Sequence, residues 1–210
     1  MEEYHKIQSI FKRDEQTHRF IDGEWSLPEF EYLKDNVWVY TEKIDGTNIR
    51  IGWDGETVEI GGRTSNAQIP TFLYQKITEL FTKEKLDTVF PKSPDEETSV
   101  ILMGEGYGAK IQKGGGNYIP DGVDFALFDI KIGTWWLKRE DVEGIAQSLG
   151  IKIVPVVGEG TIAGAILEVK NGFTSTYGNF PAEGMVLRPK VELKNRGGHR
   201  IITKLKNKDF

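Results

Sequence analysis

The sequence predicts one α+β domain over residues 1–210, built mainly from antiparallel sheets flanked by helices. Short runs rich in β-branched and aromatic residues recur along the chain and alternate with glycine-containing turns, which is typical of antiparallel strands. Longer segments between these runs place apolar residues at helical spacing instead. Apolar residue types make up 38% of the 210 residues, so one domain of this length can bury a substantial core.

The expected elements follow from these two patterns in chain order. Strands are expected at residues 37–43, 48–53, 57–60, 99–103, 123–132, 151–157, 183–188 and 199–205. Helices are expected at residues 70–90, 139–149 and 162–169. Asp54-Gly55 predicts a two-residue hairpin turn, and Gly150 is placed to end the second helix.

Composition excludes several classes of protein. The chain has no cysteine, which rules out disulfides, thiolate catalysis and cysteine-based zinc sites. The absence of cysteine also suits a cytoplasmic protein. The N-terminus is polar, and no run approaches the roughly 18 apolar residues of a membrane span, so we expect a soluble chain. The net charge of −5 argues against non-specific coating of nucleic acid.

Basic residues are concentrated near the C-terminal end of the chain, where Glu192 is the one acid among them. Such a run is either a phosphate-binding surface or a solvated terminus, and charge alone does not decide between the two. The basic residues are Arg188, Lys190, Lys194, Arg196, Arg200, Lys204, Lys206 and Lys208.

Lys43 is the candidate nucleophile. It lies in the run Glu42-Lys43-Ile44-Asp45-Gly46-Thr47-Asn48, at the end of an expected strand and beside an expected turn. A rigid sheet would hold a reactive side chain at its rim in this position. Taken alone, the four residues Lys-Ile-Asp-Gly are a weak signal, because such runs also occur as surface turns.

Five further short runs come after Lys43 in a fixed order. They are Gly62-Arg63-Thr64, Gly104-Glu105-Gly106-Tyr107-Gly108, Phe125-Ala126-Leu127-Phe128-Asp129-Ile130, Glu183-Gly184-Met185-Val186-Leu187-Arg188 and Lys204-Leu205-Lys206. This succession resembles the covalent nucleotidyltransferase superfamily of ATP-dependent DNA ligases, RNA ligases and mRNA capping enzymes, and spans about 160 residues. The resemblance implies their nucleotidyltransferase (ATP-grasp-like) fold.

Within that superfamily, Glu-Lys-x-x-Gly-Thr-Asn resembles the RNA ligase 2 type, because DNA ligases and capping enzymes more often have arginine where this chain has Asn48. The resemblance implies an ATP-dependent RNA ligase that transfers AMP to Lys43, then to a 5′-phosphate end, and finally joins that end to a 3′-hydroxyl. The cofactors would be ATP and Mg²⁺ (or Mn²⁺), and the partner RNA, with DNA or hybrid strands as the alternative. A DNA ligase core, a capping guanylyltransferase and a non-catalytic nucleic-acid-binding relative remain as other interpretations.

The resemblance also assigns roles around the phosphates and ribose. Lys204 and Lys206 would contact the α-phosphate, and their i, i+2 spacing on a strand points both to one face. A solvated basic edge strand is the alternative. Arg63 would bind the ribose or phosphates, or is an ordinary surface arginine. Glu105 would accept from the ribose hydroxyls, or is an acid in a turn.

Three residues would contact the adenine or the reactive phosphate. Phe128 would stack on the base, with Asp129 pointing the other way and Phe125 on the opposite face, in the core. Glu42 would accept from the exocyclic amine of adenine, or is a rim acid paired with a lysine. Asn48 would lie near the reactive phosphate, or stabilises its turn.

Carboxylates are the expected metal ligands. Asp45, Glu105 and Glu183 would hold Mg²⁺, in part through water, because this ion keeps several waters in its shell. The metal and the ammonium groups of Lys204 and Lys206 would favour the neutral, nucleophilic form of Lys43, because like charge disfavours a second ammonium.

The chain ends at Phe210, shortly after the last of these runs. Superfamily members continue here into an oligonucleotide-binding barrel or a helical domain, so we expect a nucleotidyltransferase domain without a C-terminal domain. It should suffice for self-adenylylation. A monomer from a bacterium or a phage-infected cell would fit this short form.

Overall fold

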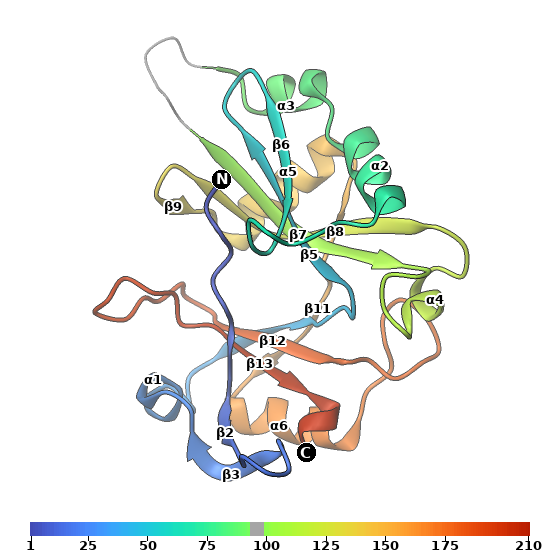
Figure 1. Cartoon of the computed structure of the whole chain (residues 1–210). Helices are drawn as coiled ribbons and strands as arrows, with labels where there is room; N and C mark the ends of the chain where they lie inside the picture. The colour runs from blue at the N-terminus through green and yellow to red at the C-terminus, as the bar shows by residue number, and fades with distance from the viewer. Residues whose placement is uncertain (93–98) are drawn as a thin grey trace. The chain divides into compact units, whose positions relative to one another are not determined.

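The computed structural model describes residues 1–92 and 99–210 (Figure 1). These residues form two compact units, each with its own sheet and its own apolar core. Unit 1 comprises Met1–His5 and Asp45–Val154, and unit 2 comprises Lys6–Ile44 and Pro155–Phe210. The chain therefore leaves unit 2 one residue after Lys43.

Unit 1 is built on a six-stranded sheet in the order β10-β8-β7-β5-β6, with β9 paired to β8. The strand pairs are antiparallel except β10 and β8, which are parallel. The strands are β5 (Thr47–Trp53), β6 (Val58–Gly62), β7 (Val100–Gly108), β8 (Val123–Ile132), β9 (Trp135–Trp136) and β10 (Lys152–Ile153).

Helices cover one face of this sheet and bury its core (Figure 1). Leu73, Leu86 and Val142, one from each of three helices, belong to the same buried cluster as Ile51 of β5. Gly150 ends the third of these helices in the left-handed conformation, as expected from the sequence. The helices are α2 (Thr71–Leu80), α3 (Lys83–Val89) and α5 (Arg139–Leu149), and a single turn, α4 (Gly115–Tyr118), lies between β7 and β8.

Two elements of unit 1 differ from the expectation. The apolar run at residues 70–90 forms two helices rather than one, because Thr82 is extended and its hydroxyl accepts from the Lys85 N–H, which caps α3. The strand expected to end near Met103 continues to Gly108, because this stretch pairs with β8. Glu105 is therefore a strand residue and not an acid in a turn.

The hairpin between β5 and β6 also differs in detail. Trp53 pairs with Val58, so the connection has four residues and is not a two-residue turn. The Asp54 carboxylate accepts from the N–H groups of Glu56 and Thr57, at 2.8 and 2.7 Å. This local pairing favours the longer loop over the tight turn.

Unit 2 is built on a five-stranded sheet in the order β1-β13-β12-β4-β11, in which β1 and β13 are parallel and the other pairs antiparallel. Trp38, Met185 and Leu205 of this sheet are buried in one cluster with residues of two helices. The strands are β1 (Gln8–Ser9), β4 (Trp38–Glu42), β11 (Val156–Gly160), β12 (Gly184–Pro189) and β13 (Thr203–Lys206), and the helices are α1 (Pro28–Tyr32) and α6 (Ile162–Asn171).

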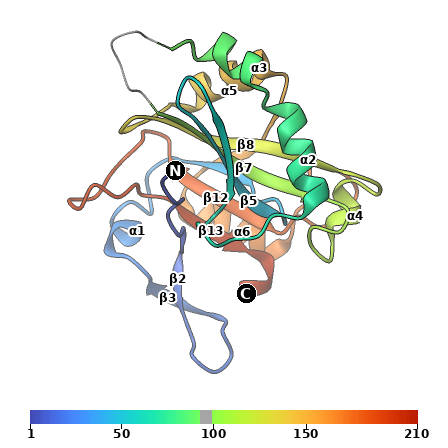
Figure 2. The same ribbon diagram turned by 45° about the horizontal axis from the view of Figure 1, so that its top comes forward.

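The N-terminal part of unit 2 had no predicted elements. It contributes the short strand β1 and a separate hairpin of β2 (Phe11–Arg13) and β3 (Phe20–Trp25) (Figure 2). A 3-10 turn, η1 (Asn207–Asp209), comes directly after β13.

One expected strand divides between the units. Residues 151–157 were expected to form a single strand, but β10 pairs with β8 in unit 1, whereas β11 pairs with β4 in unit 2. Pro155 separates them and has no N–H with which to continue a ladder.

Both units confirm the predicted α+β class with mainly antiparallel sheets. Across residues 1–92 and 99–210, no helix has the length and apolar character that crossing a bilayer requires.

Candidate active site

Lys43 lies directly after β4 in unit 2. Its backbone N–H donates to the carbonyl of Gly184 on the neighbouring strand β12, at 2.9 Å. Its side-chain Nζ pairs with Oε2 of Glu183 at 2.6 Å, and 20% of the side chain is exposed. The candidate nucleophile is therefore held at both ends while solvent still reaches it.

Glu183 bridges two lysines. Its Oε1 pairs with Nζ of Lys206 at 2.6 Å, while its Oε2 pairs with Lys43. Its backbone carbonyl accepts from the N–H of Asn207, directly after β13. One carboxylate thus lies between two ammonium groups, those of Lys43 and Lys206. The sequence alone did not predict that β4 and β13 belong to the same sheet.

Lys204 and Lys206 lie two positions apart on β13, and Leu205 between them is buried in the core. The two lysines therefore point to the face away from that core, as the i, i+2 spacing predicts. We call Lys43, Glu183, Lys204 and Lys206 the lysine cluster. It combines three cations and one anion, a composition that suits the binding of phosphate.

The pKa of Lys204 is lowered from its ordinary value. The largest cause is burial, followed by the positive charges of Lys206, Lys43, Lys6 and Arg13. A basic edge strand facing open water would not show this shift, because solvent would screen the like charges. Lys204 is therefore part of a concentrated positive field.

This shift predicts the effect of Lys204→Met. Because the folded pKa lies below the unfolded value, the Lys204 ammonium destabilises the folded state at neutral pH, and this cost disappears as pH rises towards 10.5. We expect the variant to melt at a higher temperature than the wild type at pH 7, with a gain that shrinks as pH approaches 10.5. Thermal unfolding followed by circular dichroism measures this.

A matched control is Lys208→Met, which removes an exposed lysine from the same end of the chain. It should leave the melting temperature nearly unchanged. A lower melting temperature of Lys204→Met at pH 7 would contradict the account of Lys204 as a repelled, half-buried cation.

Glu42 is buried, with 1% of its surface exposed. Its Oε1 accepts from the Ser175 hydroxyl at 2.5 Å, and its Oε2 accepts from the N–H and hydroxyl of Thr176 at 2.8 and 2.6 Å. The alternative of a rim acid paired with a lysine is therefore wrong. Contact with adenine stays a prediction.

Sequence reasoning missed Ser175 and Thr176. A buried carboxylate needs donors, and the polar run Thr174-Ser175-Thr176 after α6 supplies hydroxyls close together. The hydroxyls were visible in the sequence, but nothing local linked them to an acid 133 positions earlier.

The predicted turn after Lys43 lies in unit 1. The Asp45 N–H donates to the Tyr118 hydroxyl at 3.1 Å, and the Gln112 side chain donates to the Gly46 carbonyl at 3.0 Å. A Cβ at Gly46 would lie 2.3 Å from the Gly106 carbonyl oxygen, so close approach to β7 requires glycine here. This packing fixes the loop against the strand that carries Glu105.

Asn48 and Glu105 are register partners on β5 and β7. Asn48 Oδ1 is buried, and no described residue donates a hydrogen bond to it. A buried carbonyl oxygen without a donor is uncommon and indicates a place for a ligand, an ion or a water. The alternative interpretation, that Asn48 stabilises its turn, would require a hydrogen bond to its side chain, and Oδ1 accepts none from the described residues.

Phe125 and Phe128 have the different environments that were predicted. Phe125 is fully buried against Phe81, whereas Phe128 is half-buried beside the Tyr4 ring, at 5.2 Å between centroids. The expectation that Asp129 points away from Phe128 is wrong, because the Tyr4 hydroxyl donates to Asp129 at 2.7 Å. The register shifts at this point, with Phe128 left unpaired in a β-bulge, and alternation fails there.

Arg63 comes directly after β6, and its side chain is exposed. Its charge acts on Glu3 of the same unit: hydrogen bonds from Ser65 are the main cause that lowers the pKa of Glu3, and the charges of Arg50 and Arg63 lower this pKa further. No group of three His, Asp or Glu side chains arranged to hold a metal ion occurs in the described part of the chain. The metal-binding roles of Asp45, Glu105 and Glu183 stay predictions.

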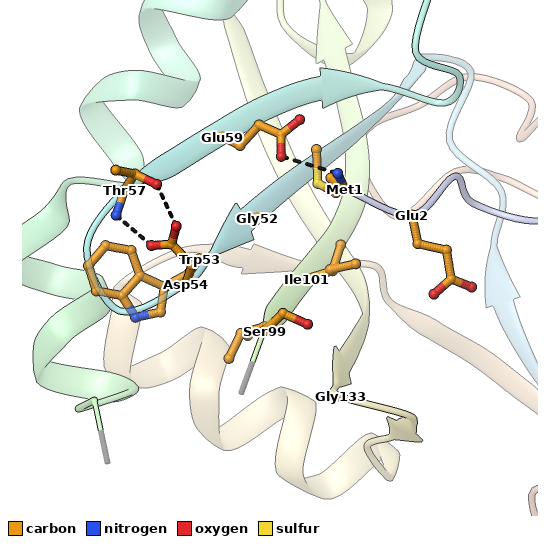
Figure 3. Close-up of a pocket in the computed structure, with 11 residues that line it drawn as sticks. Met1, Glu2, Gly52, Trp53, Asp54, Thr57, Glu59, Ser99, Ile101 and Gly133 are labelled. Atoms are coloured by element: carbon orange, nitrogen blue, oxygen red, sulfur yellow. Dashed lines mark hydrogen bonds and ion pairs between the residues drawn. The ribbon is translucent and has the colours of Figure 1, made fainter. Parts of the chain in front are cut away.

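A depression of about 300 Å³ in unit 1 lies elsewhere (Figure 3). It is bordered by Met1, whose ammonium pairs with Glu59 at 3.3 Å, and by Gly52, Trp53 and Ile101. None of the residues predicted from the motifs lines it, and we assign it no role in the chemistry.

The fold and the lysine cluster define a class of protein. An α+β fold with a lysine after β4, an acid before β12 and two lysines on β13, all in the motif positions, resembles that of the covalent nucleotidyltransferases. A model of the RNA ligase family matches residues 36–206, most of the chain. The chain belongs to the RNA ligase family.

Solved structures of Naegleria gruberi RNA ligase share the fold. A lysine-to-alanine mutant with ATP and Mn matches with a TM-score of 0.68 and 17% identity, over 96% of this chain and 55% of that chain. A structure with PPi matches with a TM-score of 0.65 and 20% identity, over 85% and 52%. This chain spans about half the length of those structures.

Proposed function

We propose that this protein is an ATP-dependent RNA ligase that forms a covalent lysyl-AMP at Lys43. The observation that carries the proposal is the bridging of Lys43 and Lys206 by the Glu183 carboxylate, each at 2.6 Å, at three positions of the nucleotidyltransferase motifs. Family membership supports ligase chemistry, and ATP with Mn in a Naegleria structure supports the choice of nucleotide and metal.

In the first step, Lys43 Nζ attacks the α-phosphorus of ATP. Lys43 first gives its ammonium proton to the Glu183 carboxylate, which lies 2.6 Å from Nζ, and so becomes a neutral amine. The nitrogen–phosphorus bond then forms as the bond to pyrophosphate breaks, pyrophosphate leaves, and the nitrogen releases its second proton to water. Lys204 and Lys206 offset the charge on the α-phosphate, and stabilisation of such charge is the main task of a protein in phosphoryl transfer.

In the next steps, AMP passes to a 5′-phosphate end of RNA, and a 3′-hydroxyl then displaces it to form the phosphodiester. Asn48, Arg63, Glu105 and Phe128 of unit 1 and Glu42 of unit 2 keep the nucleotide-binding roles that the resemblance implies. We propose that residues 1–210 act as one nucleotidyltransferase domain, since the family match runs through both units.

The residues present are compatible with a divalent metal. Asp45, Glu105 and Glu183 supply carboxylate oxygens, which Mg²⁺ and Mn²⁺ prefer, and Asn48 Oδ1 is a buried oxygen without a donor among the described residues. Water would complete the shell. When bound, the metal supplies positive charge to the phosphates. We propose that the protein acts as a monomer in the cytoplasm of a bacterial or phage-infected cell, on the strength of the resemblance alone.

Sealing of matched RNA and DNA strands tests the proposal. The protein is incubated with Mg²⁺, ATP or GTP, and 5′-phosphorylated RNA or DNA of the same sequence, with and without a complementary splint. We expect joined RNA with ATP only. Joining of DNA without RNA would indicate a DNA ligase, a covalent adduct with GTP alone would indicate a capping enzyme, and no adduct would leave a non-catalytic relative.

A further inference from the structure

Arg13, a residue outside the motifs, pairs with the end of the chain. Its Nη1 and Nη2 donate to Oδ1 and Oδ2 of Asp209 at 2.9 and 2.6 Å, a two-point contact across 196 positions. Asp209 is 3% exposed. The Arg13 guanidinium also lies 4.6 Å from the centre of the Phe20 ring. A buried carboxylate held at both oxygens is fixed in position and orientation.

The same guanidinium also contacts the strand beside β13. Nη2 of Arg13 donates to Oγ of Ser9 at 3.2 Å. Ser9 is the register partner of Lys204 in the parallel β1–β13 pair. Asp209 lies in η1, the turn that begins directly after Lys206. Arg13 therefore contacts both the residue paired with Lys204 and the turn that comes after Lys206.

We propose that Arg13 is a positioning residue that keeps Lys204 and Lys206 aligned for phosphate. The inference rests on the proposed function, because the alignment matters only if these lysines act on ATP. Glu183 links this arrangement to Lys43, since it pairs with Lys206 and with Lys43. A strand end that frays would move one phosphate-binding lysine and loosen the carboxylate beside the nucleophile.

The geometry requires arginine. Lysine carries the same charge but offers a single ammonium, and it cannot bind both oxygens of Asp209 in plane while reaching Ser9. Arg13→Lys should therefore keep the electrostatic field and lose the alignment. Lys12 is the matched control: it is the preceding residue, its side chain is 60% exposed, and it forms one ion pair with Glu24 at 3.6 Å.

The test is the rate of lysyl-AMP formation in Arg13→Ala, Arg13→Lys, Asp209→Asn, the double variant Arg13→Ala/Asp209→Asn and Lys12→Ala, well below each melting temperature. We expect the maximal rate to fall roughly 10-fold to 100-fold in Arg13→Ala, since small displacements of catalytic groups cost this much. The ATP concentration at half-maximal rate should change little. Arg13→Lys should lose nearly as much as Arg13→Ala, because it keeps the charge but not the two-point contact with Asp209. Lys12→Ala should lose nothing, and the double variant no more than Arg13→Ala.

Hydrogen exchange of residues 203–209 is measured on the same variants and needs no activity. We expect faster exchange of this segment in Arg13→Ala and Asp209→Asn. A wild-type rate of adduct formation in folded Arg13→Ala and Arg13→Lys would overturn the proposal, as would unchanged exchange. If the wild type forms no adduct, the proposed function has failed and the positioning role fails with it, while exchange still shows whether Arg13 holds the segment.

Discussion

Replacing Lys43 by alanine is expected to abolish both the covalent AMP adduct and the sealing of 5′-phosphorylated RNA. The variant removes the only group proposed to form the nitrogen–phosphorus bond, and loss of a nucleophile costs an enzyme roughly 10⁶-fold in kcat. The side chain is 20% exposed, and its backbone bond to Gly184 does not depend on it, so the fold should persist. Labelled ATP followed by denaturing electrophoresis measures the adduct.

A pre-adenylylated RNA strand distinguishes loss of the nucleophile in Lys43→Ala from misfolding of the variant. Such a strand already carries AMP at its 5′ end, so its sealing does not need the lysine adduct. We expect Lys43→Ala to join it measurably while failing on the 5′-phosphate strand with ATP. Lys190→Ala, which removes an exposed lysine paired with Glu159, should behave as the wild type. An adduct of normal yield in Lys43→Ala would show that another residue is the nucleophile.

Glu183→Gln is expected to have the second largest effect. Glutamine keeps the size of the side chain but removes the anion that lies between Lys43 and Lys206. Two ammonium groups, each about one fifth exposed, would then lack their counter-charge. Glutamine also cannot accept the ammonium proton of Lys43 or supply negative charge to the metal. We therefore expect the rate of adduct formation to fall roughly 10²–10³-fold, the scale for loss of one electrostatic contact in a catalytic site.

The same variant should also lower the free energy of unfolding, by about 1–3 kcal/mol, because hydrogen bonds to charged groups are lost where water reaches poorly. Urea unfolding measures this. Glu159→Gln is the control, an acid of unit 2 that pairs with one exposed lysine at 2.8 Å, and it should stay within about 0.5 kcal/mol of the wild type. A wild-type rate of adduct formation in Glu183→Gln would show that Glu183 has no role in the reaction.

Local patterns predicted the parts of the fold that local forces determine. The strand before Lys43, the long strand through Phe125, and the helix ended by Gly150 all formed where alternation or periodicity placed them. The spacing of Lys204 and Lys206 likewise predicted a shared face, because a strand has a period of two.

Long-range pairing could not be predicted in the same way. The donors to Glu42 are Ser175 and Thr176, and the partner of Arg13 is Asp209, each joined by contacts that no periodicity reports. The bulge at Phe128 depends on the register against β7, which is a property of two strands and not of one. Patterns in the sequence predicted the candidate residues, and only the tertiary structure showed which other residues contact them.

Mapping of the AMP adduct tests most directly whether Lys43 is the nucleophile. The wild-type protein is incubated with ATP and Mg²⁺, its intact mass is measured, and the modified peptide is fragmented to locate the added group. We predict one AMP per chain, attached to Lys43 through an acid-labile nitrogen–phosphorus bond and absent from Lys43→Ala. AMP on another residue, or an unchanged mass with active nucleotide and metal present, would contradict it.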